Sequence, residues 1–172
     1  MLGLYELIRK FEIDNPYNTF PCPDVFSADY DTYAITVNLP NNVSNTEIRM
    51  YLYDTSGSAM TDTNYDSHSK ILDSTTGATD SIEPSLTYWK APFSNSGTEG
   101  SGGMLYVFNP YSSTLETTAM SQSINHHTGS SNFQYIRGTY RRRTVEQSTG
   151  FSLNRSVSPR TFEGIVTVYG IK

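Results

Sequence analysis

The chain has 172 residues and a mass of 19.2 kDa, which is enough for one domain with a buried core and short for two. Hydrophobic residues make up only 36% and charged residues 17%, while Tyr, Ser and Thr are abundant; this composition is typical of an all-β domain and argues against a helical bundle. The single cysteine, Cys22, excludes an internal disulfide, and no run of 18 apolar residues is present to cross a membrane.

The net charge of −5 hides an asymmetry between the two halves of the sequence. Residues 1–100 contain 5 Lys and Arg against 14 Asp and Glu, a net charge of −9, and residues 101–172 contain 7 against 3, a net charge of +4. Such a dipole can steer docking between copies or onto a charged neighbour. The alternative is that carboxylates of surface loops happen to cluster early in the chain.

The first residues carry an apolar stripe at helical spacing, formed by Leu4, Leu7, Ile8 and Phe11. This spacing predicts a short amphipathic helix over residues 2–12, too short to be stable alone in water. The charged residues among them argue against a secretory signal peptide, so we expect synthesis in a cytoplasm.

Three prolines follow, Pro16, Pro21 and Pro23, and they favour an extended path. We therefore predict a helix and proline-rich arm over residues 1–29, which binds a partner through its apolar stripe. The alternative is a segment that caps one end of its own domain.

Residues 30–172 read as short strands separated by polar turns. Alternation of apolar and polar residues, or short apolar runs, predicts strands near residues 33–39, 47–53, 86–93, 104–108, 133–140, 142–145, 151–153 and 161–172. Residues 54–82 are mostly polar and predict a long loop that holds one short strand. Strands at this spacing without intervening helices predict a jelly-roll-like antiparallel β-sandwich.

Candidate metal and catalytic residues are few. Asp62 to Asp73 matches several positions of a calcium-binding loop, but Ser67 stands where its sharp turn needs glycine. His126 and His127 are adjacent in a polar stretch and lack a visible third ligand. His68 and Cys22 do not form a nucleophile–base pattern, and no glycine-rich phosphate loop is present. The sequence therefore predicts no enzyme activity, no metal and no cofactor.

A basic cluster, Arg137, Arg141, Arg142 and Arg143, is the densest charge feature of the chain. On an edge strand these side chains would pair with the acidic half of another subunit or remain solvated and block unwanted strand pairing. Basic residues beside tyrosine also occur in nucleic-acid sites, but the chain as a whole is acidic, so we expect no nucleic acid. The preferred prediction is a basic edge that binds a partner subunit.

Residues 103–171 resemble a module of marine bacteriophage and cyanophage virion structural proteins. The resemblance rests on LYVFNPYSS, the polar stretch TLETTAMSQSINHHTG, the strand FQYIRGTYRRR, the segment GFSLNRSVSPRTFEG and the closing IVTVYGI. The earlier strands YAITVNLP and IRMYLY match the same family in texture, and residues 1–29 lie outside the module.

This resemblance implies a β-sandwich without catalytic residues, located in the virion. The expected function is a capsid decoration (cement) protein that binds the major capsid protein or another virion protein, as a homo-oligomer with a trimer as one option. A tail or fibre appendage or receptor-binding module is the first alternative. A carbohydrate-binding β-sandwich is the second, because jelly rolls often hold sugars on exposed aromatic residues.

Overall fold

The computed structural model is an antiparallel β-sandwich, and it describes residues 4–15, 18–39, 42–91, 93, 95–97, 100–127, 132–156 and 162–172. No helix occurs in these segments. The predicted all-β, antiparallel β-sandwich is therefore confirmed.

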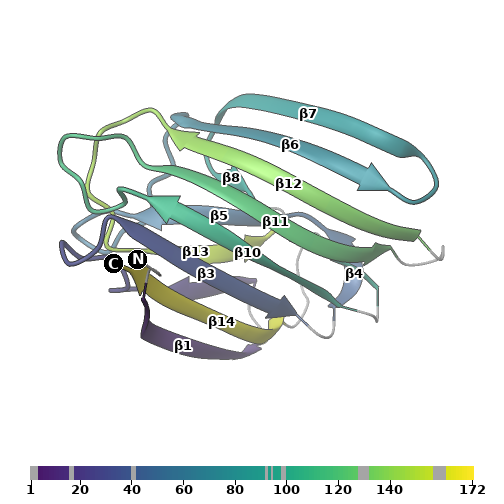
Figure 1. Cartoon of the computed structure of the whole chain (residues 1–172), viewed down its shortest axis with the longest axis horizontal. Helices are drawn as coiled ribbons and strands as arrows, with labels where there is room; N and C mark the ends of the chain where they lie inside the picture. Colours follow the sequence, from purple (N-terminus) through teal and green to yellow (C-terminus); the bar gives the residue numbers. More distant parts are fainter. Residues whose placement is uncertain are drawn as a thin grey trace.

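The larger sheet has eight strands, and every neighbouring pair is antiparallel. Their order is β1 (Tyr5–Asn15), β14 (Phe162–Ile171), β3 (Thr32–Leu39), β10 (Ser101–Phe108), β11 (Thr118–His127), β12 (Asn132–Arg142), β6 (Tyr65–Asp73) and β7 (Gly77–Leu86). Figure 1 looks onto this sheet, with the β6–β7 hairpin at its upper edge and β1 at its lower edge.

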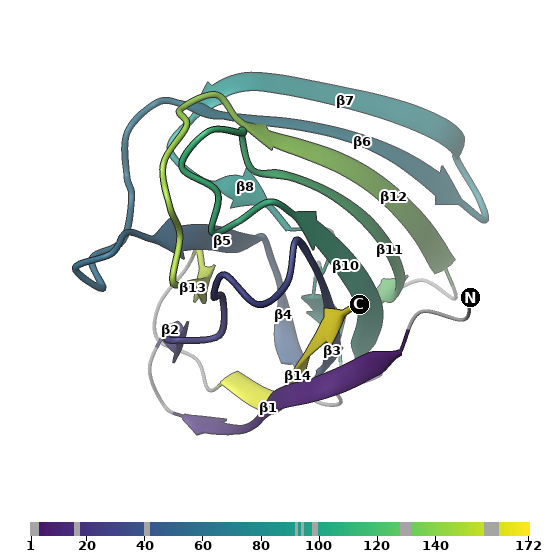
Figure 2. The same cartoon turned by 60° about the vertical axis from the view of Figure 1, so that its left-hand side comes forward.

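The smaller sheet has four strands in the order β2 (Thr19–Cys22), β13 (Gly150–Arg155), β5 (Ile48–Tyr53) and β8 (Trp89–Lys90). Figure 2 shows the larger sheet curving around the smaller one. A separate two-stranded ribbon joins β4 (Asn42–Thr46) to β9 (Asn95–Gly97). The smaller sheet thus covers the inner face of the large sheet except toward β7, which is exposed along most of its length.

The core lies between the two sheets because side chains alternate across each strand. In β3 the inner residues are Tyr33, Ile35, Val37 and Leu39, all nearly inaccessible to solvent. The small sheet supplies Met50 and Leu52 from β5 and Phe151 and Leu153 from β13. Four strands predicted from the sequence coincide closely with observed strands, namely those near residues 33–39, 47–53, 104–108 and 151–153.

The predicted N-terminal helix is wrong, because these residues form β1, which pairs with β14 along its whole length. Pairing with an existing strand satisfies the backbone without the cost of nucleating an isolated helix. The register shifts between Leu7 and Arg9, which marks a β-bulge around Ile8. The strand thereby divides the predicted stripe between two faces of the sheet.

The final strand, β14, lies between β1 and β3 and is therefore interior to the sheet. Val166 and Val168 point into the core and are fully buried. Tyr169 and Ile171 lie on the outer face and are only half-buried, so they are not part of the core.

The predicted long loop over residues 54–82 is also wrong for most of its length. Tyr65–Asp73 and Gly77–Leu86 form the hairpin β6–β7, which extends the large sheet by two strands. The predicted strand near residues 86–93 is reduced to β8, which has two residues.

Candidate binding groove on the outer face of the large sheet

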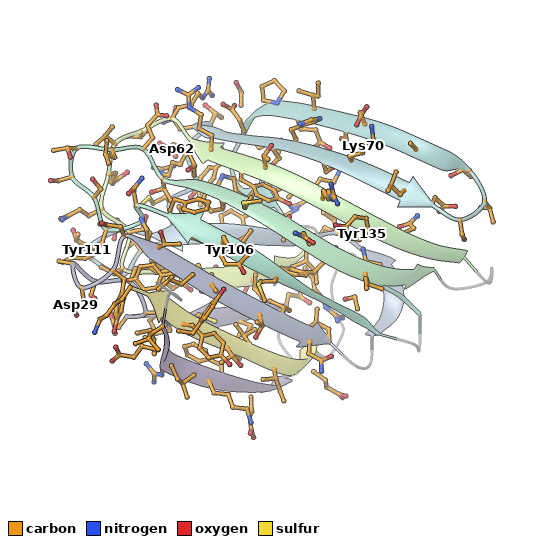
Figure 3. The ribbon with its side chains drawn as sticks, in the orientation of Figure 1. Asp29, Asp62, Lys70, Tyr106, Tyr111 and Tyr135 are labelled. Atoms are coloured by element: carbon orange, nitrogen blue, oxygen red, sulfur yellow. The ribbon has the colours of Figure 1, made fainter. Side chains whose placement is uncertain are left out.

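The strand registers place outer-face side chains in transverse rows across the eight-stranded sheet. One row runs across seven strands, through Tyr169, Ala34, Tyr106, Met120, Thr139, His68 and Ile82. A neighbouring row includes Thr118, Arg141 and Asp66. Figure 3 shows the side chains on this face, with Tyr106 and Tyr135 labelled over the middle of the sheet.

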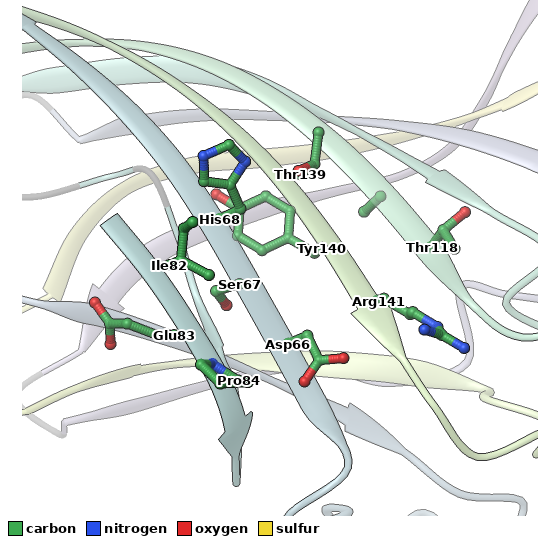
Figure 4. Close-up of a pocket in the computed structure, with 11 residues that line it drawn as sticks. Asp66, Ser67, His68, Ile82, Glu83, Pro84, Thr118, Thr139, Tyr140 and Arg141 are labelled. Atoms are coloured by element: carbon green, nitrogen blue, oxygen red, sulfur yellow. The ribbon is translucent and has the colours of Figure 1, made fainter. Parts of the chain in front are cut away.

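A groove of about 550 Å³ follows these two rows over β12 and β6, between β11 and β7. Figure 4 shows the groove and the side chains that line it. The outward-facing lining residues are Asp66, His68, Ile82, Pro84, Thr118, Thr139 and Arg141. Its size is within the range of pockets that hold small organic ligands.

An irregularity of the sheet shapes one end of the groove. The register of β6 against β7 shifts between Tyr65 and Ser67, at the position of Asp66, and Ser85 of β7 adopts a φ of 60°. The Ser85 amide donates to Asp66 Oδ1 at 3.1 Å, and Arg143 Nη2 donates to Ser85 Oγ at 3.0 Å. A bulge of this kind bends the strand and re-aims its side chains.

Three polar side chains along the groove have hydrogen-bonding capacity to spare. No hydrogen bond joins the hydroxyl of Thr118, the hydroxyl of Thr139 or the imidazole of His68 to another described residue. Thr139 and His68 are directly opposite each other on β12 and β6. Together they present donors and acceptors at the centre of the groove.

Charged groups lie at the same end of the groove. Arg141 donates from Nε and Nη2 to the two carboxylate oxygens of Glu116, at 2.6 and 2.9 Å, and this pairing raises the pKa of Arg141. Asp66 Oδ1 lies 3.6 Å from Arg143 Nε. The guanidinium of Arg141 is therefore held in place with its Nη1 group outside the pair.

The remaining wall of the groove is apolar. Ile82 is 75% exposed, and Pro84 lies beside it on β7. The carboxylate of Glu83 is engaged by Lys90 Nζ at 2.7 Å and Ser81 Oγ at 2.8 Å. The groove thus combines an apolar side with a few open polar groups, which is the usual character of a small-molecule site.

A layer of aromatic side chains supports the groove from beneath. Trp89 Nε1 donates to the carbonyl oxygen of Arg141 at 3.1 Å, and its ring lies 5.8 Å from that of Tyr140 and 5.9 Å from that of Tyr65. Burial raises the pKa of Tyr65 to about 12, so its hydroxyl stays protonated and donates to the Met60 carbonyl oxygen. Rigid packing below the sheet fixes the positions of the groove residues.

The predicted basic edge does not lie on an edge strand, because β12 is flanked by β11 and β6. Arg142 is 1% exposed and pairs with Asp62 at 2.6 Å and Glu146 at 2.8 Å, so its predicted role in partner binding is wrong. Arg143 contacts Asp66 and the Thr63 carbonyl oxygen, so part of the acidic half of the sequence is paired within the chain.

The other two arginines of the cluster remain on the surface. Arg137 donates to the Tyr135 hydroxyl at 2.8 Å and lies over its ring, and Arg141 lines the groove. Partner binding by Arg137, Arg141 and Arg143 stays a prediction.

The predicted apolar stripe of the arm is divided by β1. Ile8 and Phe11 pack against the core, and the Phe11 ring lies 5.9 Å from that of Phe20. Leu4 and Leu7 are 75% and 59% exposed. A common binding surface formed by all four residues is therefore excluded, and Leu4 and Leu7 are the members that a partner could contact.

The calcium-loop pattern is not a loop in the structure, because β6 begins at Tyr65. Asp62 pairs with Arg142, and Asp73 accepts hydrogen bonds from Thr75 and Gln134. Among the residues that the structure describes, no group of three His, Cys, Asp or Glu side chains could hold a metal ion. The backbones of His126 and His127 belong to β11, and their side chains lie outside the described part.

Sequence reasoning missed the groove because its residues are dispersed from Asp66 to Arg141. Within single strands the only regularity is the two-residue spacing of Asp66 with His68 and of Thr139 with Arg141, which any strand face shows. His68 looked isolated because its neighbours across the sheet are 14 and 71 positions away, at Ile82 and Thr139.

No model of a known protein family and no curated protein matches the chain. Solved structures that match include the galectin LEC-6 of Caenorhabditis elegans, with a TM-score of 0.38 and 9% sequence identity over 95% of each chain. In the described segments, no helix has the length and apolar character needed to span a membrane.

Proposed function

We propose that the protein is a non-enzymatic carbohydrate-binding β-sandwich whose ligand occupies the groove over β6, β7, β11 and β12. The observation that carries this proposal is the set of unengaged groups on Thr118, Thr139 and His68 beside an apolar wall. Saccharides present hydroxyl groups that both donate and accept, together with apolar C–H faces. A groove with both kinds of surface suits such a ligand.

The absence of catalysis is part of the proposal. Hydrolysis of a glycosidic bond generally needs two carboxyl groups on opposite sides of the bond. Two carboxylates, those of Asp66 and Glu83, line the described groove. Glu83 is engaged by Lys90 and Ser81, which leaves Asp66 as the one that faces outward. The proposed activity is therefore recognition of a glycan, with no bond cleaved.

The test is isothermal titration calorimetry of the intact protein against a panel of oligosaccharides, with Thr139→Val as the probe variant. This substitution removes one hydroxyl at nearly constant volume, and the loss of one ligand hydrogen bond should weaken binding by about 3- to 10-fold. Thr36→Val is the matched control, because Thr36 lies on the same sheet face on β3 and does not line the groove.

Two results would overturn the proposal. One is the absence of binding to any oligosaccharide of the panel by the unmodified protein. The other is an equal loss of affinity in Thr139→Val and Thr36→Val, with unchanged melting temperatures in both.

The second candidate is the virion structural role that the sequence resemblance implies, as a capsid decoration protein or as a tail or fibre appendage. It is favoured by the exposure of Leu7 on the edge strand β1 and of Leu4 just before it, where apolar side chains are available to a major capsid protein or another virion protein. A homo-oligomer, a trimer included, belongs to this proposal. Mass spectrometry of purified virions would locate the chain, and its absence from particles would exclude the role.

A further inference from the structure

A second hollow lies among the loops at one end of the sandwich, separate from the groove. It has a volume of about 270 Å³ and is formed by the segment before β3, the loop after β10 and the segment before β13. Its lining residues include Asp31, Asn109, Tyr111, Ser112 and Gln147. Figure 3 labels Tyr111 at this end of the molecule, beside Asp29.

Backbone hydrogen bonds fix the three segments to one another. The Asn109 amide donates to the Asp31 carbonyl oxygen at 2.7 Å, and the Ser148 amide donates to the Pro110 carbonyl oxygen at 2.7 Å. Gln147 Nε2 donates to the Tyr111 carbonyl oxygen at 3.1 Å. The walls of the hollow are therefore held in position before any ligand arrives, which lowers the entropic cost of binding.

Several polar groups of the hollow remain open. No hydrogen bond joins the side chains of Asp31 or Asn109, or the Tyr111 hydroxyl, to another described residue. Asn109 adopts a φ of 55°, a turn conformation that asparagine tolerates better than most residues.

The charge of the hollow restricts the class of ligand. Asp31 is the one ionisable carboxylate among the lining residues, and no Lys, Arg or His lines the hollow. A carboxylate accepts hydrogen bonds from two hydroxyl groups, while it repels an anion. The Asn109 amide both donates and accepts, and the Tyr111 ring offers an apolar face.

We propose that this hollow binds a single neutral sugar residue, with Asp31 accepting hydrogen bonds from adjacent hydroxyls and Tyr111 packing against the ring. The site shares no residue with the groove and does not depend on it. Together with the groove, this gives the protein two saccharide-binding sites. Arg141 and His68 line the groove, whereas the hollow has the carboxylate of Asp31 and no Lys, Arg or His.

The test uses the full chain and methyl glycosides of neutral hexoses, followed by amide chemical shifts in solution NMR. Saturable shifts are expected at Asn109, at residues 111–114 and at Gln147; Pro110 has no amide proton. Asp31→Asn removes the charge at constant shape and should weaken this binding by at least about 10-fold, because charge-assisted hydrogen bonds are roughly twice as strong as neutral ones. Asp80→Asn is the matched control, because Asp80 is exposed on β7 and neither lines the hollow nor hydrogen-bonds a residue that does.

Three results would overturn the inference: no saturable shift at these residues with any neutral hexose, tighter binding of the corresponding uronic acids, or equal losses in Asp31→Asn and Asp80→Asn. Thr139→Val should leave monosaccharide shifts at this hollow unchanged. Failure of the groove to bind oligosaccharides would therefore be distinguishable from failure of this site.

Discussion

The two halves of the large sheet's inner face differ in chemistry although both are buried. On β3 and β14 the inner residues are apolar, namely Tyr33, Ile35, Val37, Leu39, Val166 and Val168. On β11, β12 and β6 the buried inner residues include Ser121, Ser123, Asn125, Gly138 and Ser67. The candidate groove lies on the outer surface of this second, polar half.

The two halves therefore contribute to stability in different ways. The apolar half gains free energy from burial of hydrocarbon surface, at about 25 cal/mol for each Å². The polar half is filled by the large rings of Trp89, Tyr65 and Tyr140, which need small residues opposite them. Ser121 Oγ and the Tyr140 hydroxyl lie 3.1 Å apart, and burial raises the pKa of Tyr140, so that hydroxyl keeps its proton.

The largest expected contrast comes from truncating one side chain in each half. Ile35→Ala should lower the free energy of unfolding by about 2–5 kcal/mol, because a buried Ile is replaced by a cavity. Ser121→Ala removes one hydrogen bond with Tyr140 and should cost about 1 kcal/mol. Urea denaturation of both variants measures the difference, and equal costs would show that the two halves contribute alike.

The second prediction concerns the close packing of the polar half. A Cβ at Gly138 would collide with the ring and hydroxyl of Tyr140 and lie 2.7 Å from Ser121 Oγ. Gly138→Ala should therefore lower the free energy of unfolding by about 1–3 kcal/mol. Gly102→Ala is the control, since its Cβ would meet no atom closer than 3.6 Å. Thermal melting of both variants decides, and a neutral Gly138→Ala would mean that the aromatic layer is loosely packed.

The third prediction tests the division of β1 between the two faces of the sheet. Phe11 packs against the core beside Phe20, so Phe11→Ser should lower the free energy of unfolding by about 1–2 kcal/mol. Leu7 is on the outer face, and Leu7→Ser should change the free energy of unfolding by less than about 0.5 kcal/mol. Chemical denaturation measures both variants. If Leu7→Ser is the more destabilising one, Phe11 is not the residue of β1 that packs against the core.

The smallest expected effect concerns the ion pair of Arg142, at the end of β12. Burial opposes ionisation of Asp62, but hydrogen bonds from Arg142 and Asn64 outweigh it and hold the pKa of Asp62 below its ordinary value. A carboxyl group with a lowered pKa in the folded state stabilises the fold above its unfolded pKa. This contribution is lost as pH falls through the folded pKa.

Asp62→Asn should therefore cost about 0.5–1 kcal/mol at neutral pH, and the difference from the unmodified protein should shrink in acid. The exposed pair of Lys70 and Asp80, 3.9 Å apart, provides the control variant Asp80→Asn, for which no measurable change is expected. Melting temperatures across the acidic range measure both. A cost for Asp62→Asn that is independent of pH would contradict the assigned ionisation.

The sequence alone determined the all-β class and most of the apolar half of the core. The alternation in residues 33–39 and 47–53 is a local pattern, since burial of one strand face requires an apolar residue at every second position. The terminal residues were likewise predicted to form a strand, but both of its faces carry large apolar side chains, so the pattern alone did not decide that Val166 and Val168 are the buried ones. The same rule failed for β11 and the β6–β7 hairpin, where small and polar residues face the aromatic layer. It failed for β1 because Leu4, Leu7, Ile8 and Phe11 fit helical spacing as well as a bulged strand.

The candidate sites were decided only by the tertiary structure. The groove gathers Asp66, His68, Thr118, Thr139 and Arg141 from three strands, β6, β11 and β12, and no spacing in the sequence relates one strand's residues to another's. The burial of Arg142 in the basic cluster also depends on a distant residue. Its ion-pair partners are Asp62, 80 positions away in the sequence, and Glu146, 4 positions away. A strand's own residues decide which of its faces is apolar, but the pairing of distant strands decides which polar side chains become neighbours.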